Sequence, residues 1–203
     1  HAVMNYPLSE SIKDYFLRQH KKTGQFISEI NSQSMYYKQQ ISEVMFNLLD
    51  SHDTERILTT ANGNIQHVKA ALTFLYLQKG TPCIYYGTEL ALIGGPDPDC
   101  RRVMPWDRVS EDNDMLNFMK KLIKVRKEVA SIIQHGNYRL EEVKPDVLSL
   151  KWNYEGKEVQ TIFNQSSENF VLERDSVDLS SHCQFEDGQQ VILPDGFIIT
   201  VSK

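Results

Sequence analysis

The sequence has few cysteines and no long hydrophobic run. Its three cysteines, Cys83, Cys100 and Cys183, are odd in number and irregularly spaced in 203 residues. This pattern fits neither a disulfide framework nor a zinc site, and it favours a reducing cytoplasm. No apolar stretch approaches the roughly 20 residues of a membrane span, and nothing at the start has the pattern of a signal peptide. We therefore expect a cytoplasmic protein without a membrane partner.

Phosphate-binding signals are also missing. The pair Gly94-Gly95 is not followed by Gly-Lys-Ser/Thr, and no Gly-x-Gly-x-x-Gly pattern occurs. The formal charge of −5 and the short, interrupted basic clusters argue against a surface that follows a nucleic-acid backbone. The sequence thus predicts no nucleic-acid partner, no cofactor and no metal.

Two regions differ in pattern, which predicts an α/β part at 1–134 and an all-β domain at 135–203. In the first region, short apolar runs alternate with segments of helical periodicity, as in βα units. The predicted strands are 2–6, 45–49 and 83–86. The predicted helices begin at Pro7, near Phe26, at Ile65 and at Asn113, and Gly80 is expected at the C′ position of the third. Three βα units cannot close an eight-stranded barrel, so periodicity alone leaves open a small sheet or part of a barrel.

The second region predicts an antiparallel β sandwich. The alternating runs 147–152 and 158–163 form a hairpin, and strands follow at 170–173, 191–193 and 197–201, with a turn at 194–196. Trp152 and Tyr154 are the only aromatic residues here that could form an exposed platform, although strand pairing explains them equally well.

The first candidate site follows the strand at 45–49. Asp50, His52, Asp53 and Arg56 lie within seven residues, just past the carboxyl end of that strand, where α/β folds bind ligands. A carboxylate beside an imidazole and a guanidinium suits the stabilisation of positive charge or the binding of sugar hydroxyls. Helix capping by Ser51 or Asp53, or a simple Asp–Arg ion pair, remains an alternative.

A second candidate segment is the long Gly/Pro/Asp loop at 94–107. It is long for a connector between a strand and a helix, which indicates a functional loop. Its aspartates, arginines and tryptophan suit polyhydroxylated substrates, and Asp97 and Arg101 could each bind a hydroxyl.

Together these motifs resemble the α-amylase family, and within it the neopullulanase, cyclomaltodextrinase and maltogenic amylase group. The resemblance is carried by Met4-Asn-Tyr-Pro7, Leu49-Asp-Ser-His-Asp-Thr-Glu-Arg56, Gly80-Thr-Pro-Cys-Ile-Tyr-Tyr-Gly87, Gly94-Gly-Pro-Asp-Pro-Asp-Cys-Arg101 and Pro105-Trp-Asp107. It implies a C-terminal portion, about strands 6 to 8, of a (β/α)8 barrel followed by the antiparallel β-sandwich domain. The implied ligand is an α-glucan or maltooligosaccharide.

The resemblance also implies roles for single residues. Asp53 corresponds to the catalytic carboxylate that stabilises the oxocarbenium-like transition state, and His52 to a hydrogen-bond partner of the same sugar. Asp97, Arg101 and Tyr6 correspond to substrate contacts. Two other positions depart from the family pattern: Thr88 replaces the usual Asp, and Asp50 replaces a common Gly.

The resemblance places the nucleophile and the acid/base of this retaining family on the fourth and fifth barrel strands, before His1. Retaining glycosidases need both carboxylates, so the isolated chain is expected to be inactive while the parent hydrolyses α-1,4 links, with α-1,6 links left open. Two alternatives are a non-catalytic carbohydrate-binding or transporter-associated homologue, and a free-standing binding module.

Three barrel strands leave an open sheet edge and an apolar inner face. We therefore predict that the chain forms a homodimer or that its barrel part is its least ordered region. Light scattering coupled to size-exclusion chromatography tests the first outcome, and amide hydrogen exchange tests the second. A monomer with uniformly slow exchange would contradict both.

Overall fold

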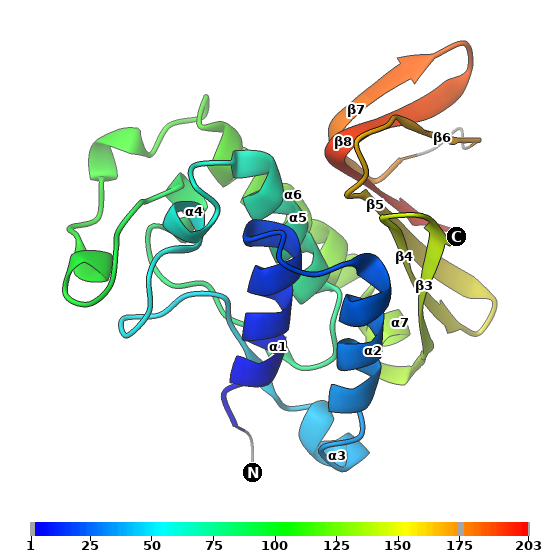
Figure 1. Ribbon diagram of the computed structural model, residues 1–203, viewed down its shortest axis with the longest axis horizontal. Helices are drawn as coiled ribbons and strands as arrows, with labels where there is room; N and C mark the ends of the chain where they lie inside the picture. Colours follow the sequence, from blue (N-terminus) through cyan, green and yellow to red (C-terminus); the bar gives the residue numbers. More distant parts are fainter. Residues whose placement is uncertain (1–2, 174–176, 203) are drawn as a thin grey trace.

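The computed structural model describes residues 3–173 and 177–202, which form a helical part followed by a curled antiparallel sheet (Figure 1). The helical part contains α1 (Tyr6–Ile12), a π-helical turn (Lys13–Leu17), α2 (Thr23–Gln33), α3 (Gln39–Ser42), β1 (Phe46–Asn47), α4 (Ile57–Thr60), α5 (Ile65–Tyr76), β2 (Thr81–Pro82), three 3-10 turns (Thr88–Leu90, Asp99–Arg101, Trp106–Arg108), α6 (Asp114–Glu128) and α7 (Ala130–His135). Among these residues no helix is both long and apolar enough to cross a membrane.

Asparagine side chains begin three of the helices. Asn5 accepts from the Leu8 amide at 3.4 Å, Asn64 from the Gln66 amide at 2.9 Å, and Asn113 from the Leu116 amide at 2.9 Å. Each bond satisfies a backbone N–H that has no partner inside its helix. The predicted helices are therefore confirmed, except that the helix expected over 113–133 ends at Glu128 and restarts after Val129.

The strands of the helical part are shorter than predicted. β1 and β2 pair in parallel over two residues each, and Met4 adds a single bridge to Phe46; Ala2 lies outside the described residues. The strand predicted at 83–86 is wrong. The Cys83 amide still donates to the Asn47 carbonyl at 2.7 Å. Further along, the Tyr86 carbonyl accepts a hydrogen bond from the Arg56 guanidinium and does not pair with a neighbouring strand.

Gly80 has a different role from the predicted one. Helix α5 ends at Tyr76 with Leu77 as its cap, so Gln78 occupies the C′ position. The φ of Gly80 is +99°, and a Cβ there would lie 2.6 Å from the Met45 carbonyl oxygen. A glycine is therefore needed where the chain enters β2 beside β1.

The C-terminal strands form one six-stranded antiparallel sheet in the order β3-β4-β5-β8-β6, with β7 also paired to β8. Their bounds are β3 (Asn137–Lys144), β4 (Val147–Tyr154), β5 (Lys157–Asn164), β6 (Phe170–Leu172), β7 (Leu179–Glu186) and β8 (Gln189–Val201). The predicted hairpin is confirmed as β4–β5, which turns through Glu155 and Gly156 at φ of 49° and 79°.

The predicted turn at 194–196 is wrong, because β8 continues through it. Asp195 has φ of 63°, and a Cβ on Gly196 would lie 2.4 Å from the His182 carbonyl of β7. The irregularity bends the strand instead of ending it. One half of β8 pairs with β6 and the other with β5, so the all-β part is a single sheet that curls on itself (Figure 1).

A shared hydrophobic core joins the helices to the sheet. Phe16 and Phe74 from the helices contact Phe163 of β5, with ring centroids 5.1 and 6.1 Å apart. Trp152 of β4 is 2% exposed, and its indole N–H donates to the Leu77 carbonyl at 2.8 Å. Trp152 is therefore a core residue and not an exposed platform. A second, smaller cluster comes from β4, β5 and β8 and consists of Val147, Ile162, Ile192 and Ile198.

The bend of β8 also makes a polar contact with the helices. The Asp195 carboxylate lies 3.0 Å from Nε2 of His67, a buried residue of α5. This hydrogen bond, helped by one from Asn64, holds the pKa of Asp195 below its usual value of 3.8.

We predict that Asp195→Asn lowers the free energy of unfolding by about 1 kcal/mol at neutral pH. A lowered pKa in the folded state adds stability above the usual aspartate pKa, and that stability is lost as the pH falls through the lowered pKa. In urea unfolding, the difference between wild type and variant should stay constant down to about pH 5 and shrink as the pH falls below about 4. Asp112→Asn, at an exposed aspartate, is the control; a difference independent of pH would contradict the assignment.

Candidate functional site

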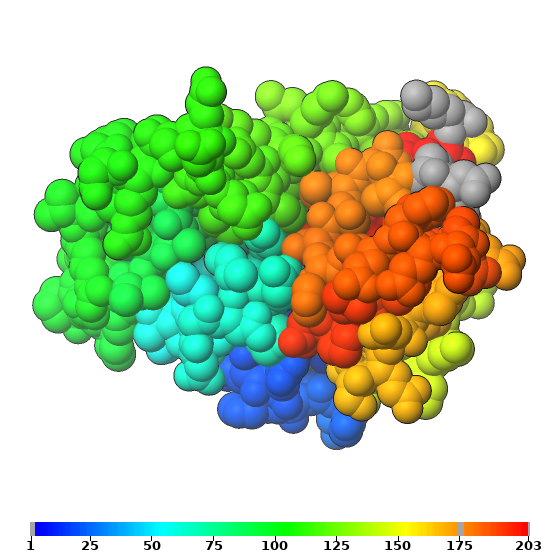
Figure 2. Space-filling model, turned by 90° about the horizontal axis from the view of Figure 1, so that it is seen from above, coloured from blue at the N-terminus to red at the C-terminus, as the bar shows by residue number. Residues whose placement is uncertain are grey.

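Two loops meet beyond the carboxyl ends of the parallel strands β1 and β2. The first is 48–56, which leads into α4, and the second is 87–108, which carries the three 3-10 turns. This is the edge where parallel α/β folds place ligand sites. In Figure 2 the green loop region forms one end of the molecule, away from the orange β7–β8 hairpin at the other end.

Four of the five predicted site residues form one cluster. Nε2 of His52 lies 3.1 Å from an Asp53 carboxylate oxygen. The Arg101 guanidinium lies 2.8 Å from Asp97 and 3.7 Å from the same Asp53 oxygen. Arg101 therefore links the two loops and contacts both carboxylates.

Backbone contacts hold the two loops together beneath this cluster. The His52 carbonyl accepts from Nε of Arg101 at 3.0 Å and from the Cys100 thiol at 3.1 Å. Within the first loop, the Ser51 hydroxyl accepts from the Asp53 amide at 3.2 Å. The position of Asp53 is thus set by its own loop and by the neighbouring one.

The side chains of the cluster are open to solvent. The exposed fractions are 63% for His52, 61% for Asp53, 49% for Asp97 and 47% for Arg101. Exposed ion pairs contribute only about 0–1 kcal/mol each, so the arrangement adds little stability. It does present two carboxylates, an imidazole and a guanidinium to a ligand that approaches this edge.

Tyr6, the fifth predicted residue, lies outside the cluster. It begins α1, and its hydroxyl lies 3.9 Å from the Met4 sulfur. No hydrogen bond or ion pair found among residues 3–173 and 177–202 joins it to Asp53 or Arg101. In the same described ranges no group of three His, Cys, Asp or Glu side chains has a metal-binding arrangement.

Arg56 lies beneath the site, and its side chain is fully buried. Its Nε donates to the Cys100 carbonyl at 2.8 Å, and its guanidinium also donates to the Tyr86 carbonyl. The guanidinium carbon lies 3.9 Å from the ring centre of Tyr85, a cation–π contact. The predicted Asp–Arg ion pair is therefore not what Arg56 forms; it binds carbonyls and rings.

Asp50 supplies the buried carboxylate of the same region. Its Oδ2 accepts from the Thr88 hydroxyl at 2.8 Å and from the Ile57 amide, the first of α4, at 3.4 Å. The proposed capping of this helix by Ser51 or Asp53 is wrong, because Asp50 faces the helix start. Burial raises the pKa of Asp50, against the opposing hydrogen bond from Thr88 and the charge of Arg56.

The contact between Asp50 and Thr88 was not predicted, and it joins the two departures from the family pattern. Compared with the family pattern, this sequence lacks a carboxylate at position 88 and has an additional one at position 50. The structure places these two side chains in one hydrogen bond. One carboxylate is therefore present in this buried space, contributed by the first loop.

Comparison with family models covers the first 121 residues of this chain. Residues 1–121 match the family model described as "Alpha amylase, catalytic domain". The chain belongs to the α-amylase family. This match ends inside α6 and covers both loops of the cluster, which is where the motifs of the resemblance lie.

Three curated relatives show similar coverage. The chain is 40% identical over 169 residues to an "Intracellular maltogenic amylase" of Bacillus subtilis (strain 168), covering 82% of this chain and 29% of the relative. It is 38% identical over 171 residues to a "Cyclomaltodextrinase" of Thermoanaerobacter pseudethanolicus, covering 84% and 30%. It is 40% identical over 138 residues to "Neopullulanase 2" of Thermoactinomyces vulgaris, covering 68% and 23%. The chain thus spans less than a third of each of these relatives.

Solved structures match over the whole chain. A structure titled "Cyclomaltodextrinase" superposes with a TM-score of 0.82 at 32% identity, covering 100% of this chain and 37% of that one. A cyclic alpha-maltosyl-(1-->6)-maltose hydrolase from Arthrobacter globiformis superposes with a TM-score of 0.84 at 22% identity, which supports the fold alone. The α/β part followed by the antiparallel sheet is therefore the architecture of this chain.

We predict that the buried carboxylate can be supplied from either loop. Asp50→Gly removes the acceptor of Thr88 and Ile57 and should cost about 2 kcal/mol of unfolding free energy. Thr88→Asp alone should also destabilise, because it places a second carboxylate beside Asp50. The double variant should be more stable than the sum of the single effects by about 1–3 kcal/mol in a double-mutant cycle of urea unfolding. Additive effects would contradict the shared role.

Proposed function

We propose that the cluster of His52, Asp53, Asp97 and Arg101 binds an α-glucan or maltooligosaccharide. The observation that supports this most is the placement of Arg101, which contacts Asp97 at 2.8 Å and Asp53 at 3.7 Å from a second loop. Carboxylates accept two hydrogen bonds per oxygen and a guanidinium donates several, so together they match a row of sugar hydroxyls. The names of the relatives, a maltogenic amylase and a cyclomaltodextrinase, agree with this ligand class.

Asp53 is proposed as the charge-stabilising carboxylate of the complete enzyme. Glycoside hydrolysis passes through an oxocarbenium-like transition state, and a carboxylate near the sugar ring stabilises its positive charge. His52, 3.1 Å from Asp53, would hydrogen-bond the same sugar, and Asp97 and Arg101 would hold its neighbours. A substrate contact by Tyr6 remains a prediction from the family resemblance alone.

The complete protein is proposed to be a retaining hydrolase of α-1,4-linked glucans, with α-1,6 links as a second linkage to be tested. Retention requires a nucleophile and an acid/base about 5–5.5 Å apart. The resemblance assigns both to earlier barrel strands. We therefore propose that this chain contributes glycan binding and charge stabilisation, and that alone it does not hydrolyse.

The domain division and location belong to the same proposal. The change from helix to strand at Gly136, between α7 and β3, supports a catalytic-barrel segment at 1–134 and a β domain at 135–203. Three free cysteines and the relative named as intracellular support a cytoplasmic location. A homodimer stays a prediction from the open barrel edge.

We predict that maltoheptaose binds the 203-residue chain and that Arg101→Ala weakens this binding by about tenfold or more, the loss of one charge-assisted contact. Asp53→Asn should weaken it less, because the shape of the side chain is kept. Arg102→Ala is the matched control, since Arg102 pairs with Asp99 and not with the cluster. Isothermal titration calorimetry measures each affinity.

The same preparations test the absence of hydrolysis. Cyclodextrin and pullulan incubated with the chain should release no reducing sugar. Turnover that disappears in Asp53→Asn would contradict the proposed inactivity. Binding unaffected by Arg101→Ala would contradict the proposed site.

A further inference from the structure

Tyr86, in the segment that follows β2, contacts the loop at 94–107 through its hydroxyl. This hydroxyl donates to the Arg102 carbonyl at 2.6 Å, across 16 residues of chain. The contact therefore lies next to Arg101, the residue that joins the two carboxylates of the cluster. Neither the strand-end pattern nor the composition of the loop assigns Tyr86 a role in the site.

Arg56 holds both the backbone and the ring of Tyr86. The Tyr86 carbonyl accepts from the Arg56 guanidinium, and the guanidinium carbon lies 4.7 Å from the centre of the Tyr86 ring. The ring of Tyr85 packs edge-on against the same ring, with centroids 4.7 Å apart. Because a charge-assisted hydrogen bond and a cation–π contact act on one residue, the Tyr86 hydroxyl is directed toward a defined point.

Arg56 and Tyr86 together hold the backbone on both sides of Arg101. Nε of Arg56 donates to the Cys100 carbonyl at 2.8 Å, and the Tyr86 hydroxyl donates to the Arg102 carbonyl. Cys100 and Arg102 are the residues directly before and after Arg101. Since the backbone has only two freely rotating dihedrals per residue, holding these two carbonyls restricts the direction of the Arg101 side chain.

The ion pairs of Arg101 are too weak to set this direction. Its side chain is 47% exposed, and its partners Asp53 and Asp97 are exposed as well. Water and salt compete with ion pairs of this kind, and a long arginine side chain samples many rotamers. A ligand that binds such a side chain must first order it, so a backbone that already directs the guanidinium makes binding tighter.

We propose that Tyr86 is a positioning residue for Arg101. Its hydroxyl fixes the backbone after Arg101, so that the guanidinium faces Asp53 and Asp97 before a ligand arrives. Tyr86 acts through Arg101 and does not itself bind the ligand. The inference rests on the proposed binding of a glycan by the cluster. Because the hydrogen bond to Arg102 is exposed, its loss should change the order of the loop more than the stability of the chain.

The first test is calorimetric titration of the 203-residue chain with maltoheptaose. Tyr86→Phe removes only the hydroxyl and should weaken binding about threefold. In a chain that already carries Arg101→Ala, the same substitution should have no further effect, because the residue that Tyr86 positions is gone. Effects that add in the double variant would overturn the proposal, since Tyr86 would then act independently of Arg101. Equal affinities of wild type and Tyr86→Phe would overturn it as well.

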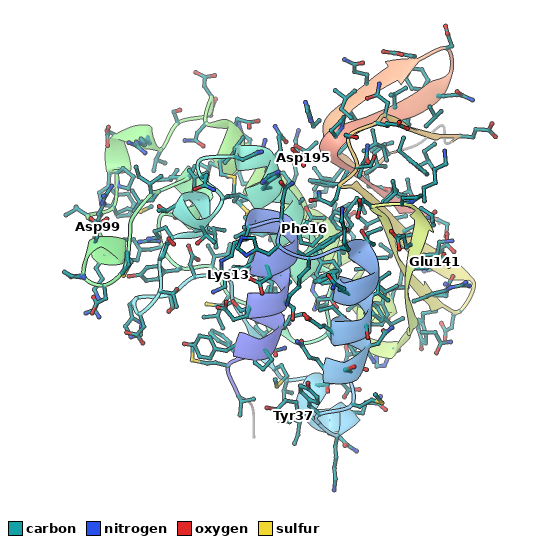
Figure 3. The ribbon with its side chains drawn as sticks, in the orientation of Figure 1. Lys13, Phe16, Tyr37, Asp99, Glu141 and Asp195 are labelled. Atoms are coloured by element: carbon teal, nitrogen blue, oxygen red, sulfur yellow. The ribbon has the colours of Figure 1, made fainter. Side chains whose placement is uncertain are left out.

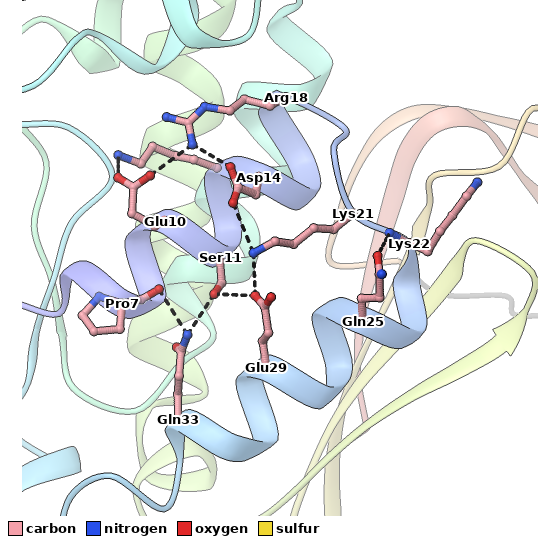
Figure 4. Close-up of polar contacts among 11 residues, drawn as sticks. Pro7, Glu10, Ser11, Asp14, Arg18, Lys21, Lys22, Gln25, Glu29 and Gln33 are labelled. Atoms are coloured by element: carbon pink, nitrogen blue, oxygen red, sulfur yellow. Dashed lines mark hydrogen bonds and ion pairs between the residues drawn. The ribbon is translucent and has the colours of Figure 1, made fainter.

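Two control variants separate positioning from general damage. Tyr37→Phe is the matched substitution, because Tyr37 is also 38% exposed and lies beside α3, away from the loop of Asp99 (Figure 3). Ser11→Ala tests lost stability, since the Ser11 hydroxyl accepts from Gln33 at 2.8 Å where α1 meets α2 (Figure 4). Both variants should bind maltoheptaose as wild type does. If Ser11→Ala weakens binding as much as Tyr86→Phe, the positioning role is wrong.

The second test needs no ligand and measures ¹⁵N relaxation of the Arg101 side chain. Nε of Arg101 donates to the His52 carbonyl at 3.0 Å, so this N–H should be ordered in wild type. Tyr86→Phe should lower its order parameter, and Tyr37→Phe should not. An unchanged order parameter in Tyr86→Phe would overturn the positioning role. A wild-type chain that does not bind maltoheptaose would instead overturn the proposed function, and the order parameter would still decide whether Tyr86 positions Arg101.

Discussion

The candidate site depends on one buried cation, Arg56. Its guanidinium binds carbonyls from two other segments, Tyr86 and Cys100, and its own amide donates to the Gly94 carbonyl at 3.0 Å. These contacts connect the loop after β1, the segment that follows β2 and the loop at 94–107. A buried charge is costly unless it is paired or hydrogen-bonded. The bond to the Cys100 carbonyl holds this backbone beside the first loop, and the next residue, Arg101, lies 3.7 Å from Asp53.

Close packing around Arg56 explains why position 94 is a glycine. A Cβ on Gly94 would lie 2.7 Å from the Asp99 carbonyl and 3.2 Å from Cγ of Arg56. Any larger residue would push the loop away from the guanidinium, and the Cys100 carbonyl would move with it. Buried contacts thus position the exposed cluster of His52, Asp53, Asp97 and Arg101, while the ion pairs of the cluster itself contribute little stability.

The sequence predicted the architecture and most of the cluster, because both depend on local patterns. Helical periodicity gave α1, α5 and the start of α6, and alternation gave the β4–β5 hairpin. His52 and Asp53 were predictable because they follow a strand end, where parallel sheets place their ligands. Asp97 and Arg101 were predicted from the composition of their long loop and from the family resemblance.

The parts that were mispredicted depend on contacts between distant segments. The strand expected at 83–86 fails because Arg56, 30 residues earlier, takes the Tyr86 carbonyl. The turn expected at 194–196 fails because Gly196 must pack on the β7 backbone. Tyr6 was included through the family resemblance, and no local pattern indicated its distance from the cluster. Neither periodicity nor turn composition carries this information.

Asp50 and Asp53 lie three residues apart and differ in how far a ligand can reach them. Asp50 is 4% exposed and satisfied by Thr88 and the start of α4, so a ligand cannot reach it. Asp53 is 61% exposed and faces a guanidinium across a gap of 3.7 Å, wide enough for a weak contact that a ligand can replace. Composition alone does not distinguish these two aspartates. Their difference in burial leaves only the Asp53 carboxylate accessible to a ligand.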